Sequence, residues 1–433
     1  MKTKAIRLYG RNDLRMEAFE LPPVGDDGIL ARVVCDSICM SSFKAAHEAD
    51  THRRVPRDVA QHPVIIGHEF AGELVEVGAK WQDTFHAGDK FSIQPALNDP
   101  DGPVGILSAP GYSYPYIGGD ATYVLIPDAV MANGCLLPYA GEGFYPASLA
   151  EPLSCVIGAM HACYHTTPSS YAHRMDIRDG GCMAILAGVG PMGLAAVNYV
   201  IHRTDRRPSM LIVTDIDQAR LDRARMLYSP DEAARNGIRL EYVNTSAMPN
   251  PVATLRAMTP LGAGYDEAFV FAPVAAIVEQ ADGLLAVDGC LNFFAGPSKA
   301  DFRATLNFYN VHYASTHVAG TSGGNTDDMK EALAMMGCGL DPAGLVTHVG
   351  GLNAVIDTTM NLPSISGGKK LIYTHVDMPL TPLAAFADRG RENPVYAELH
   401  RLCTAHRGLW NVEAENFLLA HAGELHTDNS HHA

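Results

Sequence analysis

The chain has 433 residues, enough for two or three domains, of which 47% are hydrophobic and 18% are charged. This composition excludes an intrinsically disordered protein, because the chain has ample apolar surface to bury. The net charge of −16 argues against nucleic acid and anionic membranes as general partners, since both repel an acidic surface. We therefore expect a soluble, acidic protein of more than one domain.

The elements predicted along the chain change character near residue 180. The first 130 residues favour β-strands, in runs separated by Gly, Pro and Asp at 5–10, 29–36, 71–78, 89–95 and 121–127. A helix is predicted over 151–165. Apolar strands then alternate with helices such as 217–228, at 183–189, 210–215, 267–273, 290–296 and 315–320. This alternation predicts a parallel sheet covered on both faces, which is the doubly wound α/β class.

The last hundred residues predict a return to the first domain. Residues 327–336 indicate a helix, and 369–376 (KKLIYTHV) indicate an isolated strand. The remaining sequence contains helical segments at 393–408 and 412–421. We predict a discontinuous catalytic domain (1–155 and 323–375), a dinucleotide-binding domain (156–322) and a C-terminal helical extension (376–433).

Cysteine usage and the N-terminus indicate a cytoplasmic protein. The nine cysteines are odd in number and irregularly spaced, which is typical of reduced thiols rather than of a disulfide framework. The opening MKTKAIRLYGR lacks the apolar segment of a secretory signal peptide. The uncharged stretch 180–201 is interrupted by glycines and a proline, so we expect a strand, turn and helix there rather than a membrane span.

A glycine-rich turn opens the alternating region. In AILAGVGPMGLAAV the spacing G-x-G-x-x-G follows an apolar strand and starts a helix, which is the context that a dinucleotide requires. The next strand ends in an aspartate, which can accept hydrogen bonds from a ribose and repels a 2′-phosphate, so NAD(H) is favoured over NADP(H). A turn needed only for packing is the alternative. The predicted cofactor-binding residues are Gly188, Val189, Gly190, Met192, Gly193 and Asp215.

Four residues in the N-terminal part are candidate zinc ligands. Cys39, His68, Glu69 and Glu151 offer a thiolate, an imidazole and carboxylates, the usual donors of a catalytic zinc. Each also has a structural interpretation, as a small core residue, a buried histidine or a carboxylate at a helix N-terminus. Spacing alone does not join them into one site.

The order of these motifs resembles the zinc-dependent medium-chain dehydrogenase/reductase family. Cys39 is followed by GHE (67–69) with Gly72 and Gly78, by GDK (88–90), by EPLS (151–154) and by the glycine-rich turn. The glutamate of EPLS resembles the polyol, sorbitol-type branch. The resemblance implies a GroES-like catalytic domain, a Rossmann domain, assembly as a homodimer or homotetramer, and a zinc held by Cys39, His68 and either Glu69 or Glu151. Because 98–119 contains no cysteine, we expect one catalytic zinc and no structural zinc.

The resemblance also implies catalytic roles. Ser41 matches the hydroxyl that takes the proton of the alcohol, although a hydroxyl bonded to its own turn is the alternative. Glu69 is expected to hold the zinc-bound water if Glu151 is the ligand. Lys44 stands where the family often has a relay histidine, so the proton relay beyond Ser41 stays open, with His47 nearby.

Within the polyol branch, the opening MKTKAIRLYGRNDLR and the segment HRRVP resemble bacterial L-sorbose-1-phosphate reductases. The expected substrate is a polyol or ketose, in the form of a sugar phosphate. Arg53 and Arg54 are the candidate phosphate ligands, with Lys44 and Arg57 close in sequence. A solvated loop paired with nearby acids is the alternative, and an unphosphorylated polyol or alcohol is then the substrate. A zinc hydrolase or a non-catalytic nucleotide sensor is disfavoured by the combination of metal donors and glycine turn.

Overall fold

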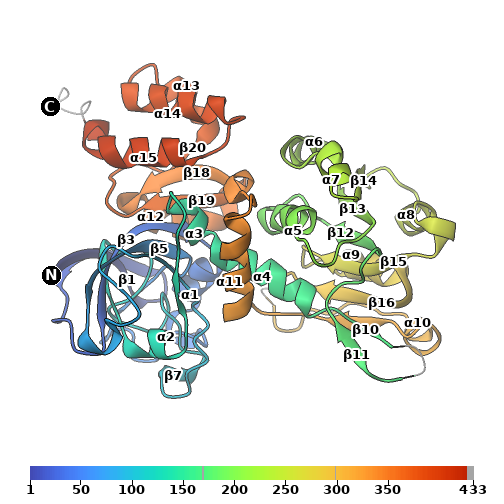
Figure 1. Ribbon diagram of the computed structural model, residues 1–433, viewed down its shortest axis with the longest axis horizontal. Coiled ribbons are helices and arrows are strands. Elements are labelled where there is room, and N and C mark those ends of the chain that lie inside the picture. The colour runs from blue at the N-terminus through green and yellow to red at the C-terminus, as the bar shows by residue number, and fades with distance from the viewer. Residues whose placement is uncertain (168–169, 298, 427–433) are drawn as a thin grey trace. The chain divides into compact units, whose positions relative to one another are not determined.

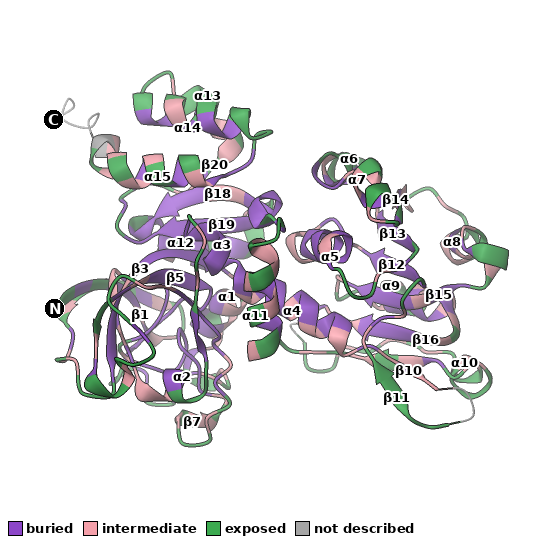
Figure 2. Cartoon of the chain, in the orientation of Figure 1, coloured by how far each residue is buried: buried purple, intermediate pink, exposed green. Residues whose placement is uncertain are grey.

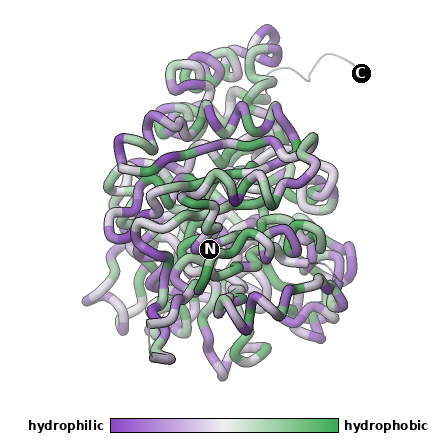
Figure 3. Tube along the Cα trace, turned by 90° about the vertical axis from the view of Figure 1, so that its right-hand side faces the viewer, coloured by the Kyte–Doolittle hydropathy of each residue, from purple (hydrophilic) through white to green (hydrophobic). Residues whose placement is uncertain are grey.

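The structure is a computed structural model that describes residues 1–433 except 168–169, 298 and 427–433 (Figure 1). The chain forms two compact units, one made of Met1–Glu151 and Asp341–Ala433 and the other of Pro152–Leu340. The sequence places the second boundary at 322/323, whereas helix α11 (Thr326–Met336) belongs to the second unit. Hydropathy alternates along the chain between apolar segments and polar turns (Figure 3). No helix among the described residues combines the length and the apolarity needed to cross a membrane.

The first unit contains two sheets. Strands in the larger, eight-stranded sheet follow the order β20-β18-β19-β3-β5-β6-β9, and β8 also pairs with β3. These strands are β3 (Ile29–Ile38), β5 (Phe70–Val77), β6 (Lys90–Ile93), β8 (Tyr123–Ile126), β9 (Leu136–Pro138), β18 (Val346–Gly351), β19 (Lys369–Tyr373) and β20 (Thr381–Pro382). The three-stranded sheet has the order β2-β1-β4. Its strands are β1 (Lys2–Gly10), β2 (Asp13–Glu20) and β4 (Val64–Ile65), and β7 (Pro103–Ile106) lies outside both sheets.

Strand β19 joins the end of the chain to its beginning. It pairs antiparallel with β3, with Lys370 opposite Ile38 and Tyr373 opposite Cys35, and it pairs parallel with β18. Strand β3 is buried along nearly its whole length because it has paired strands on both sides (Figure 2). The apolar run 29–36 is therefore a central strand, and residues 346–373 complete a sheet that the N-terminal segment starts.

Helices of the first unit cover these sheets and form the C-terminal extension. They are α1 (Met40–Glu48), α2 (Asp128–Ala132), α3 (Tyr145–Ser148), α12 (Val355–Asn361), α13 (Phe386–Arg389), α14 (Pro394–Ala405) and α15 (Val412–His421). Helix α4 (Ala150–His161) starts in this unit and continues into the second. It ends four residues earlier than the sequence predicts, because Tyr164–Thr166 forms a strand. Residues 427–433 of the extension lie outside the described residues.

The extension is bonded to the core of the first unit. Glu415 on α15 accepts hydrogen bonds from the backbone N–H groups of Phe144 and Tyr145 at 2.6 and 2.8 Å, and from the Tyr373 hydroxyl at 2.8 Å. The indole N–H of Trp410 donates to the same Tyr373 oxygen at 2.8 Å. Glu415 and Trp410 are fully buried, so the extension is an integral part of this unit.

The second unit is a doubly wound parallel sheet, which confirms the predicted fold class. Six strands run in the order β14-β13-β12-β15-β16-β17, and every neighbouring pair is parallel. This is the 3-2-1-4-5-6 order of a Rossmann fold. The strands are β12 (Cys182–Leu186), β13 (Met210–Asp215), β14 (Arg239–Asn244), β15 (Tyr265–Val270), β16 (Leu285–Phe293) and β17 (His317–Ala319). The central strand β12 is buried throughout (Figure 2), which explains its continuous apolar sequence.

The helices between these strands alternate with them as the sequence predicts. They are α5 (Pro191–His202), α6 (Gln218–Leu227), α7 (Pro230–Arg235), α8 (Pro251–Ala257), α9 (Ala275–Leu284) and α10 (Phe308–Tyr313), followed by α11. A hairpin of β10 (Tyr164–Thr166) and β11 (His173–Met175) precedes the sheet. Strand β14 does not stand out in the sequence, because RLEYVN is rich in polar residues and forms the edge of the sheet.

Candidate metal and substrate site

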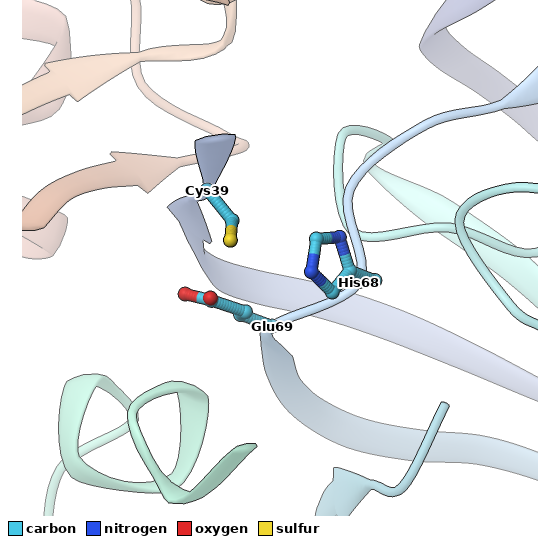
Figure 4. Close-up of side chains that lie close together, drawn as sticks. All are labelled: Cys39, His68 and Glu69. Carbon is cyan, nitrogen blue, oxygen red and sulfur yellow. The ribbon is translucent and has the colours of Figure 1, made fainter. Parts of the chain in front are cut away.

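Cys39, His68 and Glu69 converge in the first unit (Figure 4). One donor atom from each lies within 4.8 Å of the others. Cys39 comes directly after β3 and caps the N-terminus of α1, where its sulfur accepts a hydrogen bond from the backbone N–H of Ser41 at 3.5 Å. His68 and Glu69 occupy the turn just before β5. The structure thus brings together three of the four predicted metal ligands.

The His68 imidazole is buried and held at both nitrogens. Its Nδ1 lies 3.3 Å from the Ser42 hydroxyl, and its Nε2 lies 3.1 Å from the Tyr112 hydroxyl. Burial lowers the pKa of His68 to about 4, so the ring is neutral at physiological pH. A neutral imidazole is the form that binds a metal, and a hydrogen bond to the second nitrogen is the usual way of orienting such a ligand.

Glu69 is paired with Lys369 from the far end of the sequence. The ammonium Nζ of Lys369 lies 2.5 Å from both carboxylate oxygens of Glu69, and the Ser37 hydroxyl also donates to this carboxylate. Burial disfavours the charged ammonium, but the adjacent Glu69 outweighs this effect and raises the pKa of Lys369. Because β19 pairs with β3, Lys369 lies close to the residues that precede Cys39. The Glu69 carboxylate is therefore held beside the other two donors by Lys369 and Ser37.

The third ionisable group of this cluster is the Cys39 thiol, whose pKa is also shifted. Burial, with the Glu69 charge as the next cause, raises the pKa of Cys39 to about 12. A thiol with this pKa is protonated, and a divalent cation among these donors would release that proton, since zinc binds the thiolate. The donor set of thiol, neutral imidazole and carboxylate fits a zinc ion.

The remaining predicted residues lie around this group. Glu151, in the first turn of α4, is outside the three-residue cluster, although its charge acts on Cys39, Tyr112 and Lys369. The Ser41 side chain forms a hydrogen bond with Tyr112. Lys44 is half-buried on α1, and its charge lowers the pKa of His52.

The arginines of the basic segment 52–57 differ in their exposure to solvent. Arg54 is half-buried, its guanidinium carbon lies 5.9 Å from the centre of the Tyr112 ring, and its Nη1 donates to the Leu107 carbonyl at 2.9 Å. Burial lowers the pKa of Arg54, and its charge in turn disfavours protonation of His68. Arg53 and Arg57 are exposed. Of the two predicted phosphate ligands, Arg54 is the one that lies beside the site.

The glycine-rich turn has the geometry of a dinucleotide loop in the second unit. A Cβ atom on Gly193 would lie 2.3 Å from the Gly188 carbonyl oxygen, so the third glycine lets α5 pack against β12. Gly190 caps α5 without a side-chain hydrogen bond, which leaves the helix N-terminus able to bind an anion. The turn thus contains the predicted residues Gly188, Val189, Gly190, Met192 and Gly193 between β12 and the first turn of α5.

Asp215 ends β13, the strand next to β12. Its carboxylate accepts the backbone N–H groups of Ile216 and Asp217 at 2.8 and 3.1 Å. Arg220 donates to the Val189 carbonyl at 3.3 Å, so a cation also lies beside the loop. An acidic and a cationic side chain thus both lie near the glycine-rich turn.

The comparisons with known proteins agree with this geometry. Residues 25–135 match the alcohol dehydrogenase GroES-like domain. The chain is 52% identical to the uncharacterized protein YggP of Escherichia coli, with 98% of each chain covered. It is 48% identical to an L-sorbose 1-phosphate reductase of Klebsiella pneumoniae (98% and 99% covered) and 47% identical to a mannitol-1-phosphate 5-dehydrogenase of Aliivibrio fischeri (96% and 97% covered). The chain belongs to the zinc-dependent medium-chain dehydrogenase/reductase family, in its polyol branch.

Solved structures show the same fold at low sequence identity. The 2R,3R-butanediol dehydrogenase of Bacillus subtilis superimposes with a TM-score of 0.67 at 22% identity, covering 86% of this chain and 100% of that one. The predicted combination of a GroES-like and a Rossmann domain is therefore confirmed. As a member of this dehydrogenase/reductase family, the protein is an oxidoreductase.

Two residues of the site were not predicted from the sequence. Lys369 belongs to the lysine pair that opens β19, and two lysines at the start of an otherwise apolar strand are the signal that could have indicated it. Tyr112 lies in the cysteine-free loop 98–119, where nothing in the sequence separates it from Tyr114 and Tyr116.

Proposed function

We propose that this dehydrogenase is a zinc-dependent, NAD(H)-linked enzyme that interconverts a hexitol phosphate and a ketose phosphate. The observation that carries the proposal is the position of Arg54, which packs beside Tyr112, the residue whose hydroxyl contacts the candidate zinc ligand His68. The relatives named for L-sorbose 1-phosphate and mannitol 1-phosphate, similar over nearly the full chain, support the same substrate class.

Cys39 and His68 would hold the zinc, with Glu69 or Glu151 as the third ligand. The short separation of the Cys39, His68 and Glu69 donors supports Glu69, whereas its contacts with Lys369 and Ser37 occupy both carboxylate oxygens and favour Glu151. The absence of cysteine from residues 98–119 supports a single zinc per chain. Exchange of Cys39 for serine is expected to abolish zinc retention, because a hydroxyl is a poor zinc ligand.

Several side chains of the site have separate roles in the proposed reaction. When bound, zinc polarises the substrate oxygen and the nicotinamide exchanges a hydride with the adjacent carbon. Ser41 receives the alcohol proton, and Lys44 is a candidate for passing it towards solvent. Lys369 orients the Glu69 carboxylate through hydrogen bonds to both of its oxygens.

Asp215 favours NAD(H) over NADP(H). Its carboxylate is fixed by two backbone N–H groups at the end of β13, where it is suited to accept ribose hydroxyls and to repel a 2′-phosphate. Arg220 is the residue that would support the opposite preference. The family resemblance further implies a cytoplasmic protein that forms a homodimer or homotetramer. Light scattering after gel filtration measures the molar mass and so distinguishes these oligomeric states.

A phosphate next to the reacting carbon needs a cation close to the metal. In a ketose 1-phosphate the phosphate is carried by the carbon adjacent to the carbonyl. The residue that binds the phosphate must therefore lie about one side-chain length from the candidate metal ligands. Arg54 satisfies this condition through its contact with Tyr112, whereas Arg53 and Arg57 are exposed. A half-buried guanidinium is also partly desolvated, which strengthens a charge-assisted hydrogen bond.

The test compares Arg54→Ala with Arg57→Ala as the matched control. Loss of a charged hydrogen bond, about 1.5–3 kcal/mol, predicts that Arg54→Ala raises the KM for a sugar phosphate about tenfold or more. The KM for the unphosphorylated polyol should be nearly unchanged, and Arg57→Ala should affect neither. Equal efficiency of the unaltered enzyme on sorbitol and its phosphate would contradict the phosphate assignment and leave a polyol dehydrogenase.

A further inference from the structure

The cysteine-free loop 98–119 forms one wall of the metal site. It is bonded to the basic segment, because the Ser113 hydroxyl donates to the Arg54 carbonyl at 2.7 Å and Arg54 donates to the Leu107 carbonyl at 2.9 Å. It is also bonded to the GHE turn, because the backbone N–H of Gly119 donates to the Gly67 carbonyl at 2.7 Å. The loop is therefore fixed at both of the segments that surround His68.

Two glycines let this loop approach the GHE turn more closely than any side chain would allow. Gly111 and Gly67 have positive φ angles of 77° and 90°. A Cβ atom on Gly111 would lie 1.9 Å from the Gly67 carbonyl oxygen. Because the residue after Gly111 is Tyr112 and the residue after Gly67 is His68, this close backbone contact sets the two side chains against each other.

Tyr112 contacts the basic segment, the GHE turn and the start of α1. Its ring is nearly parallel to that of His52, with centroids 5.9 Å apart and an interplanar angle of 9°, and its centroid lies 4.7 Å from that of His68. Its hydroxyl lies 3.1 Å from His68 Nε2 and forms a hydrogen bond with the Ser41 side chain. The side chain is only 5% exposed, so the hydroxyl depends on these partners.

We propose that Tyr112 is a substrate-binding residue whose hydroxyl holds a hydroxyl group of the sugar chain next to the reacting carbon. The inference rests on the proposed function, in which zinc binds at His68. The Tyr112 hydroxyl lies 3.1 Å from His68 Nε2, which is within hydrogen-bond distance. Zinc bound to this nitrogen would displace the Tyr112 hydroxyl from it and leave that hydroxyl with Ser41 as its remaining partner. A buried hydroxyl that has lost one partner is stabilised by a new one, and a substrate hydroxyl provides it.

Tyr112 and Arg54 then recognise different parts of one substrate. Arg54 carries a charge suited to the phosphate, whereas Tyr112 carries a neutral donor and acceptor suited to a hydroxyl. A hydroxyl occurs in the phosphorylated and the unphosphorylated substrate alike. The two residues therefore predict separable kinetic effects.

Tyr112→Phe tests the proposal, because it removes only the hydroxyl and keeps the ring against His52 and His68. The KM should rise about tenfold for the sugar phosphate and for the free polyol, with kcat little changed, since one hydrogen bond is lost in both complexes. Tyr114→Phe is the control: this tyrosine is in the same loop, but its ring packs in the hydrophobic core of the first unit. It should leave both KM values unchanged.

Zinc affinity, measured by chelator competition, gives a readout that is independent of turnover. Tyr112→Phe should bind zinc as tightly as the unaltered protein or more tightly, because the hydroxyl competes with the metal for His68. A fall in zinc affinity would overturn the proposal, since Tyr112 would then hold the metal site together. Unchanged KM values would overturn it as well. If only the phosphate assignment is wrong, Arg54→Ala has no effect while Tyr112→Phe still raises the KM for the polyol.

Discussion

Replacing Lys369 by methionine tests how far the site depends on one buried ion pair. The side chains of Lys369 and Glu69 are 7% and 1% exposed, and methionine keeps most of the volume of the lysine stem. Removing one partner of a buried pair costs about 3–5 kcal/mol, because the other charge is left buried without compensation. The substitution therefore threatens the stability of the whole first unit and not only its chemistry.

Lys80 provides the matched control within the same unit. Its ammonium also lies 2.7 Å from both carboxylate oxygens of Asp128, but these side chains are 50% and 33% exposed. An exposed pair contributes about 0.2–1 kcal/mol. The two substitutions remove the same kind of bond, so the difference between Lys369→Met and Lys80→Met measures the effect of burial.

The assay is urea unfolding followed by tryptophan fluorescence. The two tryptophans of the chain, Trp81 and Trp410, both belong to the first unit, so the signal reports on that unit. With a slope of about 1–3 kcal/mol per molar urea, Lys369→Met should lower the midpoint by about 1 M or more. Adding Glu69→Gln should recover part of the loss, because it removes the uncompensated charge. A cost below about 1 kcal/mol, or a double variant as unstable as the sum of the single variants, would refute this reasoning.

Three further results are expected. Asp215→Ala should raise the ratio of kcat/KM with NADP(H) to kcat/KM with NAD(H), because it removes the charge that repels a 2′-phosphate. An unaltered enzyme that already prefers NADPH would contradict this prediction. Burial raises the pKa of Asp120 from 3.8 to about 8, so the unfolded chain loses this proton first and stability should fall as pH rises from about 4 to about 8. Unfolding curves across that range should flatten in Asp120→Asn, and an unchanged pH dependence would exclude Asp120 as its source. Glu415→Gln should lower the free energy of unfolding by about 1–3 kcal/mol in the same fluorescence assay, because the amide cannot accept all three hydrogen bonds from the core. A stability equal to that of the unaltered protein would show that the extension is not anchored there.

The parts of the fold that are local in sequence were predictable. The alternation of apolar strands and helices after residue 180 indicates the parallel sheet, and the spacing of Gly188, Gly190 and Gly193 indicates its nucleotide loop. The family resemblance implied Cys39 and His68 as zinc ligands, with Glu69 or Glu151 as the third. The structure brings donor atoms of Cys39, His68 and Glu69 within 4.8 Å of one another. The sheet and its loop depend on periodicity and short spacings, which a single sequence contains, whereas the metal donors were joined only by the resemblance to a known family.

The contacts between distant segments were not predictable in the same way. The pairing of β19 with β3 depends on a strand register that no local pattern encodes, so the role of Lys369 emerges only from the fold. The position of Tyr112 depends on the close approach of Gly111 to Gly67, which joins two loops. Arg53 and Arg54 were equivalent candidates in the sequence, and only their burial separates them.

The chain order of these contacts has a consequence for biosynthesis. Glu69 and Lys369 are 300 residues apart, and Tyr145 and Glu415 are 270 apart. The second unit, by contrast, is continuous from Pro152 to Leu340, so its contacts are complete before β18 and β19 are synthesised. The nucleotide-binding unit can thus fold during translation, while residues 1–151 still lack their partners from the end of the chain. At that stage β3 has an open edge where β19 will pair, and Glu69 has no Lys369 beside it. The candidate metal site is therefore among the last features of the molecule to form, and zinc loading is expected to follow release of the chain from the ribosome.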